Sequence, residues 1–375
     1  MLRQKIIRVT SISLVFISLV FSTGCGGTVP SQPSIPTTVP SHPPSNGERG
    51  DGSKTIKVLC IDGGGIRGII PAMLLAEIEK RTQKPISELF NLIVGTSTGG
   101  ILALALTKPN GQGKPQYTAK DLIGLYETDG EQIFSRSVWH RIQSGANFVG
   151  KKYPADGIEK VLDHYFEDAR LKDALTEVFI PSYDIERRAP FFFQSRNAKL
   201  NRSHDFKMKQ VARATTTAPT YFEPFKIEID VSDYVALIDG GVFANNPTLC
   251  GFAEVKSTHP EADDFLVVSL GTGEMTRRFL YDEVKGWGLA QWAQPILNVV
   301  FDGVSDVVDY QMKTLLPPAP DGTKRYYRFQ AKLDKGSEDL DNANPANVRV
   351  LKLLAEDVIH GNSDTLTLLC EQLVK

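Results

Sequence analysis

Three glycine-rich segments contain the residue types that could carry out chemistry in this sequence, and the first spans residues 62–68 (DGGGIRG). It lies between a short apolar run and a helix-like segment. Consecutive glycines have no Cβ atoms, so their backbone N–H groups can converge on one point. The start of the following helix adds partial positive charge there. The segment therefore predicts a site for an anion, either a phosphate group or the oxyanion of a reaction intermediate.

The same letters fit the GxGxxG pattern of dinucleotide-binding proteins, with glycines at positions 63, 65 and 68. That interpretation requires an acidic residue at the end of the second strand, where it would bind the ribose hydroxyl. Here the second apolar run leads instead into Gly95, Thr96 and Ser97. The sequence therefore disfavours a dinucleotide site.

The second segment, GTSTGG at residues 95–100, places a serine between an apolar strand-like run and an apolar helix-like run. This is the setting of a nucleophile elbow, a sharp turn that exposes the serine hydroxyl. Gly95 and Gly99 would let the strand and the helix approach each other closely. The alternative is an ordinary loop rich in glycine and threonine at a sheet edge. The context favours Ser97 as a nucleophile.

The third segment is Asp239, Gly240 and Gly241, directly after the apolar run 235–238 (VALI). A carboxylate on a glycine turn at the end of a strand is placed to point into a crevice above a sheet. Asp-Gly alone is only a common turn dipeptide. Beside a candidate nucleophile, however, Asp239 becomes a candidate base.

The elements that would position these segments alternate between strands and helices. We expect strands at residues 55–61, 90–94, 178–185, 191–194, 235–238, 265–270 and 326–329. We expect helices at residues 69–81 and 100–107, from about residue 282 onward, and at 347–373. Nearly continuous apolar strands between helices are typical of a sheet covered on both faces. The pattern predicts an α/β domain with a mostly parallel central sheet flanked by helices.

One helical region carries an apolar stripe formed by Trp287, Leu289, Trp292, Ile296 and Leu297. Tryptophan favours membrane interfaces, so such a stripe could contact a membrane. A stripe of this kind more often packs on the protein core. We therefore expect a core-facing helix here.

The three glycine-rich segments, together with ARATTTAPTYFE at 212–223 and SLGTG at 269–273, resemble motifs of the patatin family of lipid acyl hydrolases. The resemblance spans residues 62–273 and implies a patatin-like three-layer α/β fold. It also implies hydrolysis of phospholipids, galactolipids or other acyl esters without calcium. The implied catalytic dyad is Ser97 as nucleophile and Asp239 as general base. The implied oxyanion hole comes from the glycine turn: Gly63, Gly64 and Gly65, with Arg67 and Gly68 beside it.

In such a dyad Asp239 takes the proton of Ser97 while the hydroxyl oxygen attacks an ester carbonyl carbon. Water then releases the acyl group from the serine. An exposed aspartate is a poor base because its pKa is too low, so we expect the site to bury Asp239.

Two other functions fit parts of the sequence. One is an α/β-hydrolase esterase whose triad would be Ser97, Asp239 and then His259 or His360, which is the chain order of that fold. None of the six histidines lies in a glycine-flanked loop like the other two residues, so each is better explained as a surface or structural residue. The other is a non-catalytic lipid-binding lipoprotein, which would not need the dyad at all.

The amino terminus has the pattern of an export signal. Three basic residues precede the apolar run 12–21, which is shorter than the roughly 20 residues of a membrane-spanning helix. The run leads into Ser-Thr-Gly-Cys at residues 22–25, which resembles a bacterial lipobox even though Ser22 replaces the usual aliphatic residue. We expect residues 1–24 to be a signal peptide and Cys25 to be lipidated. Cleavage elsewhere nearby, or an uncleaved anchor, are the alternatives.

Residues 25–54 are rich in proline, serine and threonine and show no apolar periodicity. Such a segment cannot bury enough surface to fold, and its prolines keep it semi-extended. We expect a tether that joins a membrane anchor to a hydrolase domain at residues 55–375. The protein would then be exported and face the periplasm or the cell exterior.

The composition excludes several classes of function. A formal net charge of −2 over 375 residues gives no broad basic surface for nucleic acid. The four cysteines lack the paired spacing of a zinc site and are too few for a disulfide framework. No HExxH, EF-hand or P-loop spacing occurs. We therefore predict neither a metal nor a cofactor, and the composition leaves the oligomeric state open.

Overall fold

The structure of the protein is a computed structural model that describes residues 55–134, 156–219, 221–292, 295–334 and 338–375. The expected signal peptide, tether and lipidated Cys25 lie outside these residues. Across the described ranges, no helix is both long enough and apolar enough to cross a membrane.

The domain is built on an eight-stranded sheet with the order β5-β6-β3-β2-β1-β7-β9, in which β4 also pairs with β3. Its strands are β1 (Thr55–Ile61), β2 (Leu92–Gly95), β3 (Glu177–Asp184), β4 (Ala189–Gln194), β5 (Phe225–Glu228), β6 (Tyr234–Asp239), β7 (Asp264–Leu270) and β9 (Tyr326–Phe329). The five strands β3, β2, β1, β7 and β9 are mutually parallel, whereas β4, β5 and β6 join through antiparallel pairs. A separate two-stranded sheet joins β8 (Glu274–Met275) to β10 (Lys332–Leu333). The expected mostly parallel sheet is confirmed.

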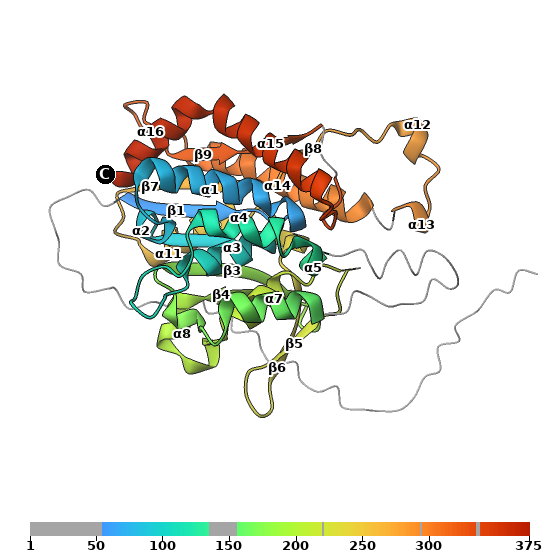
Figure 1. Cartoon of the computed structure of the whole chain (residues 1–375), viewed down its shortest axis with the longest axis horizontal. Helices are drawn as coiled ribbons and strands as arrows, with labels where there is room; N and C mark the ends of the chain where they lie inside the picture. The colour runs from blue at the N-terminus through green and yellow to red at the C-terminus, as the bar shows by residue number, and fades with distance from the viewer. Residues whose placement is uncertain (1–54, 135–155, 220, 293–294, 335–337) are drawn as a thin grey trace, which may run out of the picture. The chain divides into compact units, whose positions relative to one another are not determined.

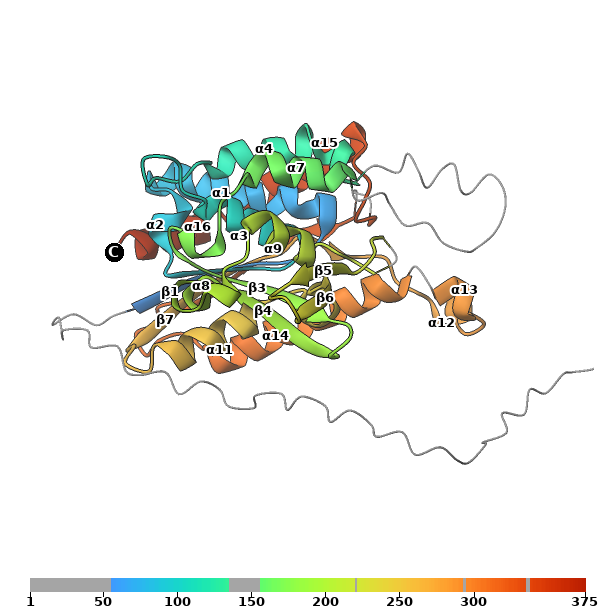
Figure 2. The same ribbon diagram turned by 90° about the horizontal axis from the view of Figure 1, so that it is seen from below.

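Helices cover both faces of the sheet, which gives three layers (Figures 1 and 2). One face carries α1 (Ile69–Thr82), α2 (Ile86–Leu89), α3 (Thr98–Thr107), α4 (Ala119–Glu127), α5 (Gly130–Phe134), α7 (Asp156–Phe166), α9 (Met208–Thr215), α15 (Pro345–Gly361) and α16 (Ser363–Val374). The opposite face carries α10 (Gly241–Ala244), α11 (Thr248–Thr258) and α14 (Pro295–Leu315). Three further short helices are α8 (Ser195–Leu200), α12 (Tyr281–Val284) and α13 (Leu289–Trp292).

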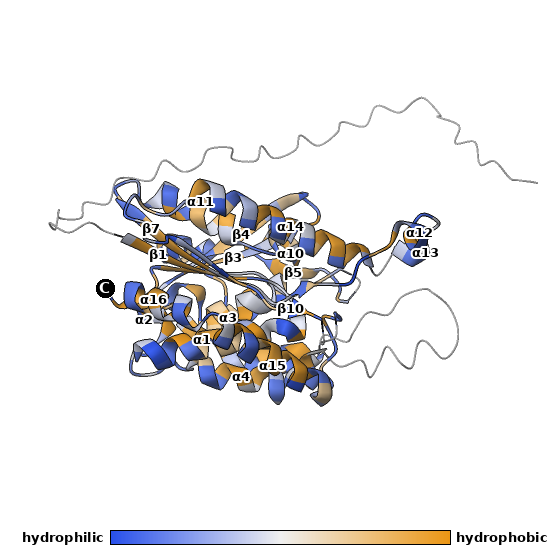
Figure 3. Cartoon of the chain, turned by 90° about the horizontal axis from the view of Figure 1, so that it is seen from above, coloured by the Kyte–Doolittle hydropathy of each residue, from blue (hydrophilic) through white to orange (hydrophobic). Residues whose placement is uncertain are grey.

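Each helix layer packs on the sheet through its own buried cluster of apolar side chains. The larger cluster includes Ile70, Leu74, Leu104, Leu351 and Leu369, and the smaller one includes Val58, Val94, Val255, Val308 and Met312. The strands between the layers are largely hydrophobic in Figure 3. A sheet that is buried on both faces selects apolar residues at nearly every strand position, which explains why the strands could be recognised in the sequence.

The expected strands are all present, with ends that differ by at most two residues. The expected helix over residues 347–373 is instead two helices, α15 and α16, which meet at Asn362. Asn362 leaves the helical backbone region, and its side-chain Nδ2 donates to the carbonyl oxygen of Val358 at 2.8 Å. The carbonyl of Val358, at the end of α15, thus accepts from both the backbone N–H and the side chain of Asn362.

The expected core-facing stripe near Trp287 is wrong. Leu289 is 94% exposed and Ile296 is 42% exposed. Trp287 packs edge-on against both Phe279 and Trp292, with ring centroids 5.4 and 5.1 Å apart. The aromatic rings thus pack on one another and leave neighbouring aliphatic side chains in solvent. We call residues 279–292, which include α12 and α13 and lie apart from the helix layers in Figures 1 and 2, the apolar arm.

Candidate active site

The pairing of β3 with two neighbours brings the second and third glycine-rich segments together. β3 pairs with β2 up to Phe179, which lies opposite Val94. It then pairs with the antiparallel strand β6, whose last residue, Asp239, lies opposite Ser182. β2 and β6 therefore end next to each other, and Ser97 lies one residue beyond Thr96, which follows the last residue of β2. This register explains how residues 142 positions apart in the sequence meet.

Ser97 occupies a strained turn between β2 and α3. Its backbone has φ 55° and ψ −123°, a conformation that a residue other than glycine rarely adopts. The N–H of Ser97 donates to Thr215 Oγ1 at 3.0 Å, and that hydroxyl donates to the carbonyl of Pro181 at 2.7 Å. A neighbouring helix and β3 therefore hold the turn in place. This is the geometry of a nucleophile elbow.

The elbow glycines are required by close packing. A Cβ atom on Gly95 would collide with the carbonyl of Gly99, and one on Gly99 would collide with the carbonyl of Ile61. α3 therefore approaches β1 and β2 more closely than any larger residue would permit. The predicted close approach of strand and helix is present.

The carboxylate of Asp239 binds the serine directly. Ser97 Oγ donates to Asp239 Oδ2 at 2.7 Å, and the N–H of Gly241 donates to Oδ1 at 2.7 Å. Asp239 is only 1% exposed, as expected for an aspartate that acts as a base. Burial raises the pKa of Asp239 to about 7, although the hydrogen bonds from Ser97 and Gly241 act in the opposite direction. A carboxyl group with this pKa can both take and return a proton near neutral pH.

Within the glycine turn, Gly63 and its neighbours differ in their backbone hydrogen bonding. The N–H of Gly63 already donates to the carbonyl of Asn245 at 3.0 Å. The N–H groups of Gly64 and Gly65 have no acceptor among the residues that the structure describes, and both glycines line a cavity that also contains Ser97. Thr98, the residue after the serine, has a similarly free N–H and lines the same cavity. The geometry thus offers Gly64, Gly65 and Thr98 as oxyanion donors rather than Gly63.

Arg67 and Gly68 support the turn from outside that cavity. The N–H of Arg67 donates to the carbonyl of Gly64 at 3.1 Å, and its buried guanidinium lines a second, polar pocket together with Asp302. Burial lowers the pKa of Arg67, and the nearby Asp302 carboxylate opposes this effect. Gly68 packs against the hydroxyl groups of Thr98 and Tyr126. These two residues therefore position the turn and do not line the cavity around Ser97.

The cavity around Ser97 and Asp239 is partly open to solvent. Its lining is mainly apolar: Ile101, Ile133, Ile158, Phe222, Phe301 and Leu340. A few convergent polar groups inside an apolar cavity are typical of a site that binds a largely apolar ligand and acts on one polar bond.

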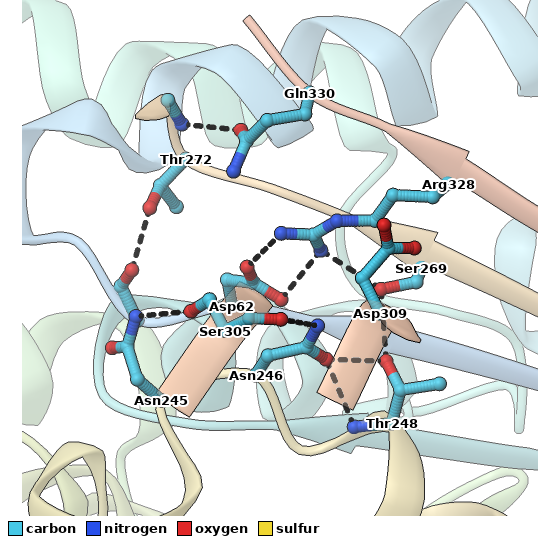
Figure 4. Close-up of polar contacts among 12 residues, drawn as sticks. Asp62, Asn245, Asn246, Thr248, Ser269, Thr272, Ser305, Asp309, Arg328 and Gln330 are labelled. Carbon is cyan, nitrogen blue, oxygen red and sulfur yellow. Dashed lines mark hydrogen bonds and ion pairs between the residues drawn. The ribbon is translucent and has the colours of Figure 1, made fainter. Parts of the chain in front are cut away.

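A buried polar network holds the glycine turn from the side of β9 (Figure 4). Arg328 binds Asp62 through two hydrogen bonds of 2.9 and 2.6 Å and also donates to Ser269 Oγ at 2.8 Å. Thr272 Oγ1 donates to the carbonyl of Gly63 at 2.5 Å. Arg328 lies outside every motif and 266 positions from Asp62, so its role could not be recognised from the sequence.

The four histidines that the structure describes do not complete a triad. Neither Ser97 nor Asp239 contacts a histidine in the described part of the chain, and none lines the cavity. His259 lies at the end of α11, where Nδ1 is 3.0 Å from Thr258 Oγ1, and His360 is exposed on α15. Positions 42 and 140 lie outside the described residues. The hydroxyl of Ser97 donates its hydrogen bond to the aspartate itself.

Metal ligands are not gathered anywhere in the described ranges, where no group of three or more His, Cys, Asp or Glu side chains is arranged to hold an ion. Cys60, Cys250 and Cys370 are free thiols. Burial raises the pKa of all three, which keeps them protonated and unreactive at neutral pH.

Comparison with known proteins agrees with this geometry. The sequence matches the Patatin family, described as patatin-like phospholipase, over residues 59–249. Patatin-like protein 4 of Arabidopsis thaliana is 33% identical over 347 residues, which cover 83% of this chain and 86% of that protein. Patatin-T5 of Solanum tuberosum is 32% identical, with 81% of this chain and 83% of that protein covered.

A third relative, probable inactive patatin-3-Kuras 1 of Solanum tuberosum, is 32% identical over 81% of this chain and 86% of that protein. Its name describes a protein without activity, so the residues of each chain have to be considered individually. In this chain the sequence motifs, the three-layer fold and the similarity over most of the sequence all indicate the same family. The chain belongs to the patatin-like phospholipase family.

Proposed function

We propose that this protein hydrolyses fatty-acyl ester bonds of phospholipids, galactolipids or related lipids, with Ser97 as nucleophile and Asp239 as base. The observation that carries the proposal is the 2.7 Å hydrogen bond from Ser97 Oγ to Asp239 Oδ2. A serine hydroxyl is a weak nucleophile unless a base accepts its proton. Asp239 is that base, because its pKa of about 7 suits proton transfer at neutral pH.

The reaction follows from the positions of the donors and acceptors. Ser97 Oγ attacks the ester carbonyl carbon and passes its proton to Asp239, which then gives it to the departing alcohol. The negative charge on the carbonyl oxygen is stabilised by the free N–H groups of Gly64, Gly65 and Thr98. Loss of one such donor typically costs about 3–4 kcal/mol of transition-state stabilisation.

A lipid substrate is supported by two apolar features. The cavity next to the dyad is lined mainly by aliphatic and aromatic side chains, which suits an acyl chain. The apolar arm exposes Leu280, Tyr281 and Leu289 by 63%, 77% and 94% of their surface. It connects to α14, whose Phe301 lines the cavity. An enzyme that takes its substrate from a lipid aggregate would benefit from such a surface near its active site.

We also propose that the protein is exported and anchored through a lipid on Cys25. This proposal depends on the sequence alone: the basic start, the apolar run and the Thr-Gly-Cys that follows. A tether at residues 26–54 would then allow the hydrolase domain to reach lipid near the anchoring membrane.

Purified protein that lacks residues 1–54 tests the activity directly. We expect turnover of p-nitrophenyl butyrate and release of fatty acid from phospholipid vesicles. A fluorophosphonate should modify Ser97, as identified by peptide mass spectrometry. Folded Ser97→Ala protein should be inactive and unlabelled, whereas activity above a few per cent would refute the assignment. Lipid binding by wild-type protein without any turnover would favour the non-catalytic alternative.

A further inference from the structure

Asn245 follows the Asp239 turn and is 5% exposed, and it lines the cavity that holds the dyad. Its Nδ2 atom donates to Ser305 Oγ at 3.1 Å, as Figure 4 shows. Ser305 Oγ donates its only proton to the carbonyl of Phe301 at 2.9 Å, so toward Asn245 it can only accept. This arrangement fixes the amide: the nitrogen faces Ser305, and the oxygen faces the opposite way.

The amide oxygen of Asn245 lies beside the nucleophile. A Cβ atom placed on Gly63 would be 2.5 Å from Asn245 Oδ1 and 3.3 Å from Ser97 Cβ, so both groups border the same small space. Asn245 Oδ1 is buried and makes no hydrogen bond among the described residues. A buried carbonyl oxygen without a donor is costly, and a native site keeps one when a ligand or water supplies the donor.

The second half of the proposed reaction needs an acceptor of this kind. The water that attacks the acyl-enzyme carries two protons, and Asp239 can take only one of them. The other proton would otherwise point into a mainly apolar cavity, where an unpaired O–H group is unfavourable. We propose that Asn245 Oδ1 binds this water and orients it for attack, an inference that depends on the proposed Ser97–Asp239 hydrolase activity.

The step balances without any further reactant. The water oxygen bonds to the acyl carbon while one of its protons moves to the Asp239 carboxylate. The carbon–oxygen bond to Ser97 then breaks, and the proton on Asp239 returns to Ser97 Oγ. The fatty acid keeps the second water proton, which stays hydrogen-bonded to Asn245 Oδ1 until the product leaves.

Methanol distinguishes this role from a structural one. Methanol has a single O–H proton, which goes to Asp239, and a methyl group where water has its second proton. A site that lacks the Asn245 acceptor should therefore lose hydrolysis but retain methanolysis. With p-nitrophenyl butyrate in buffer that contains methanol, the ratio of methyl butyrate to butyric acid reports this partition after the acyl-enzyme has formed.

We expect Asn245→Leu to raise the ratio of methyl ester to acid about tenfold relative to wild type, which is the size of one lost hydrogen bond. Asn246→Leu is the matched control, because Asn246 is the next residue and is also buried, with 1% of its surface exposed, but does not line the cavity. Its ratio should equal that of wild type. Ser305→Ala, which removes the anchor of the amide, should raise the ratio by a smaller factor and gives a second test if Asn245→Leu does not fold.

An unchanged ratio in folded Asn245→Leu, or in Ser305→Ala when only that variant folds, would overturn the inference even if total turnover falls. The proposed function itself is tested separately by the release of p-nitrophenol from wild-type protein and by fluorophosphonate labelling of Ser97. If wild type fails both, the proposed function fails. If wild type passes both and the partition does not move, only the role of Asn245 fails.

Discussion

Replacing Asp239 by asparagine should stabilise the protein at neutral and alkaline pH while it abolishes ester hydrolysis. Burial raises the pKa of this carboxyl from its ordinary 3.8 to about 7 in the folded protein. In the unfolded chain the group ionises near pH 4. Between these two values the folded state binds more protons than the unfolded state, so stability falls as the pH rises from about 4 to about 7.

The size of the effect follows from the shift. One pKa unit corresponds to about 1.4 kcal/mol, so the full shift of about three units destabilises the wild type by at most about 4 kcal/mol above pH 7. About two of those units, or about 3 kcal/mol, fall between pH 5 and pH 8. Asparagine does not ionise, so Asp239→Asn should escape this loss.

Urea denaturation at pH 5 and pH 8 measures the effect. The stability of Asp239→Asn minus that of wild type should increase by up to about 3 kcal/mol between the two pH values. Other titrating groups are common to both proteins and cancel. Ser97→Ala is the control, because it is also inactive but retains the buried carboxyl group. It lacks the Ser97 hydrogen bond that lowers the pKa of Asp239, so its stability should fall between pH 5 and pH 8 at least as much as that of wild type.

The same pKa governs activity. In the proposed mechanism the carboxylate form of Asp239 is the base, so kcat/KM for a soluble ester should rise as the pH increases through about 7. An equal stability difference at pH 5 and pH 8 would refute the raised pKa. An acid limb near pH 4 would refute it independently.

Three further predictions concern other parts of the molecule. His259→Ala and His360→Ala should each retain turnover within about twofold, whereas loss of a triad histidine costs on the order of 10⁴-fold or more; a drop of that size would restore the triad. Leu289→Glu should lower turnover on phospholipid vesicles about tenfold and leave p-nitrophenyl butyrate turnover unchanged. A leucine side chain that is buried in the lipid surface contributes about 1.5–3 kcal/mol to binding, and the soluble ester does not require that binding. Leu353→Glu, which changes a leucine 58% exposed elsewhere on the surface, should affect neither substrate. Cys25→Ala expressed from the full-length gene should no longer incorporate radiolabelled palmitate, and a mature amino terminus other than residue 25 would contradict lipidation.

The candidate site residues could be recognised from the sequence where a reactive residue type lies in a distinctive local pattern. Ser97 and Asp239 could be singled out because each lies close to glycines at the end of an apolar strand, and a strand buried on both faces is recognisable by composition. Their contact could not be calculated from the sequence, because it depends on β3 pairing with β2 and β6 in succession.

Features that arise only from tertiary packing could not be predicted. The three glycines of the turn cannot be distinguished in the sequence. In the structure the carbonyl of Asn245 accepts a hydrogen bond from the N–H of Gly63, whereas the N–H of Gly64 has no acceptor among the described residues. The stripe near Trp287 failed for a related reason. The spacing of apolar residues indicates that their side chains will be buried, but it does not identify the residues that bury them. Here the aromatic rings pack on one another rather than on the protein core.

The ion pair between Asp62 and Arg328 has a consequence for biosynthesis. A chain that has been synthesised only as far as residue 273 already contains every recognised motif, including the proposed nucleophile and base, but still lacks the cation that compensates buried Asp62. An uncompensated buried carboxylate costs about 3–5 kcal/mol, enough to leave the glycine turn without its native geometry. The catalytic centre would therefore assemble only after β9 has been synthesised, which would delay lipid hydrolysis until nearly the entire chain has been made.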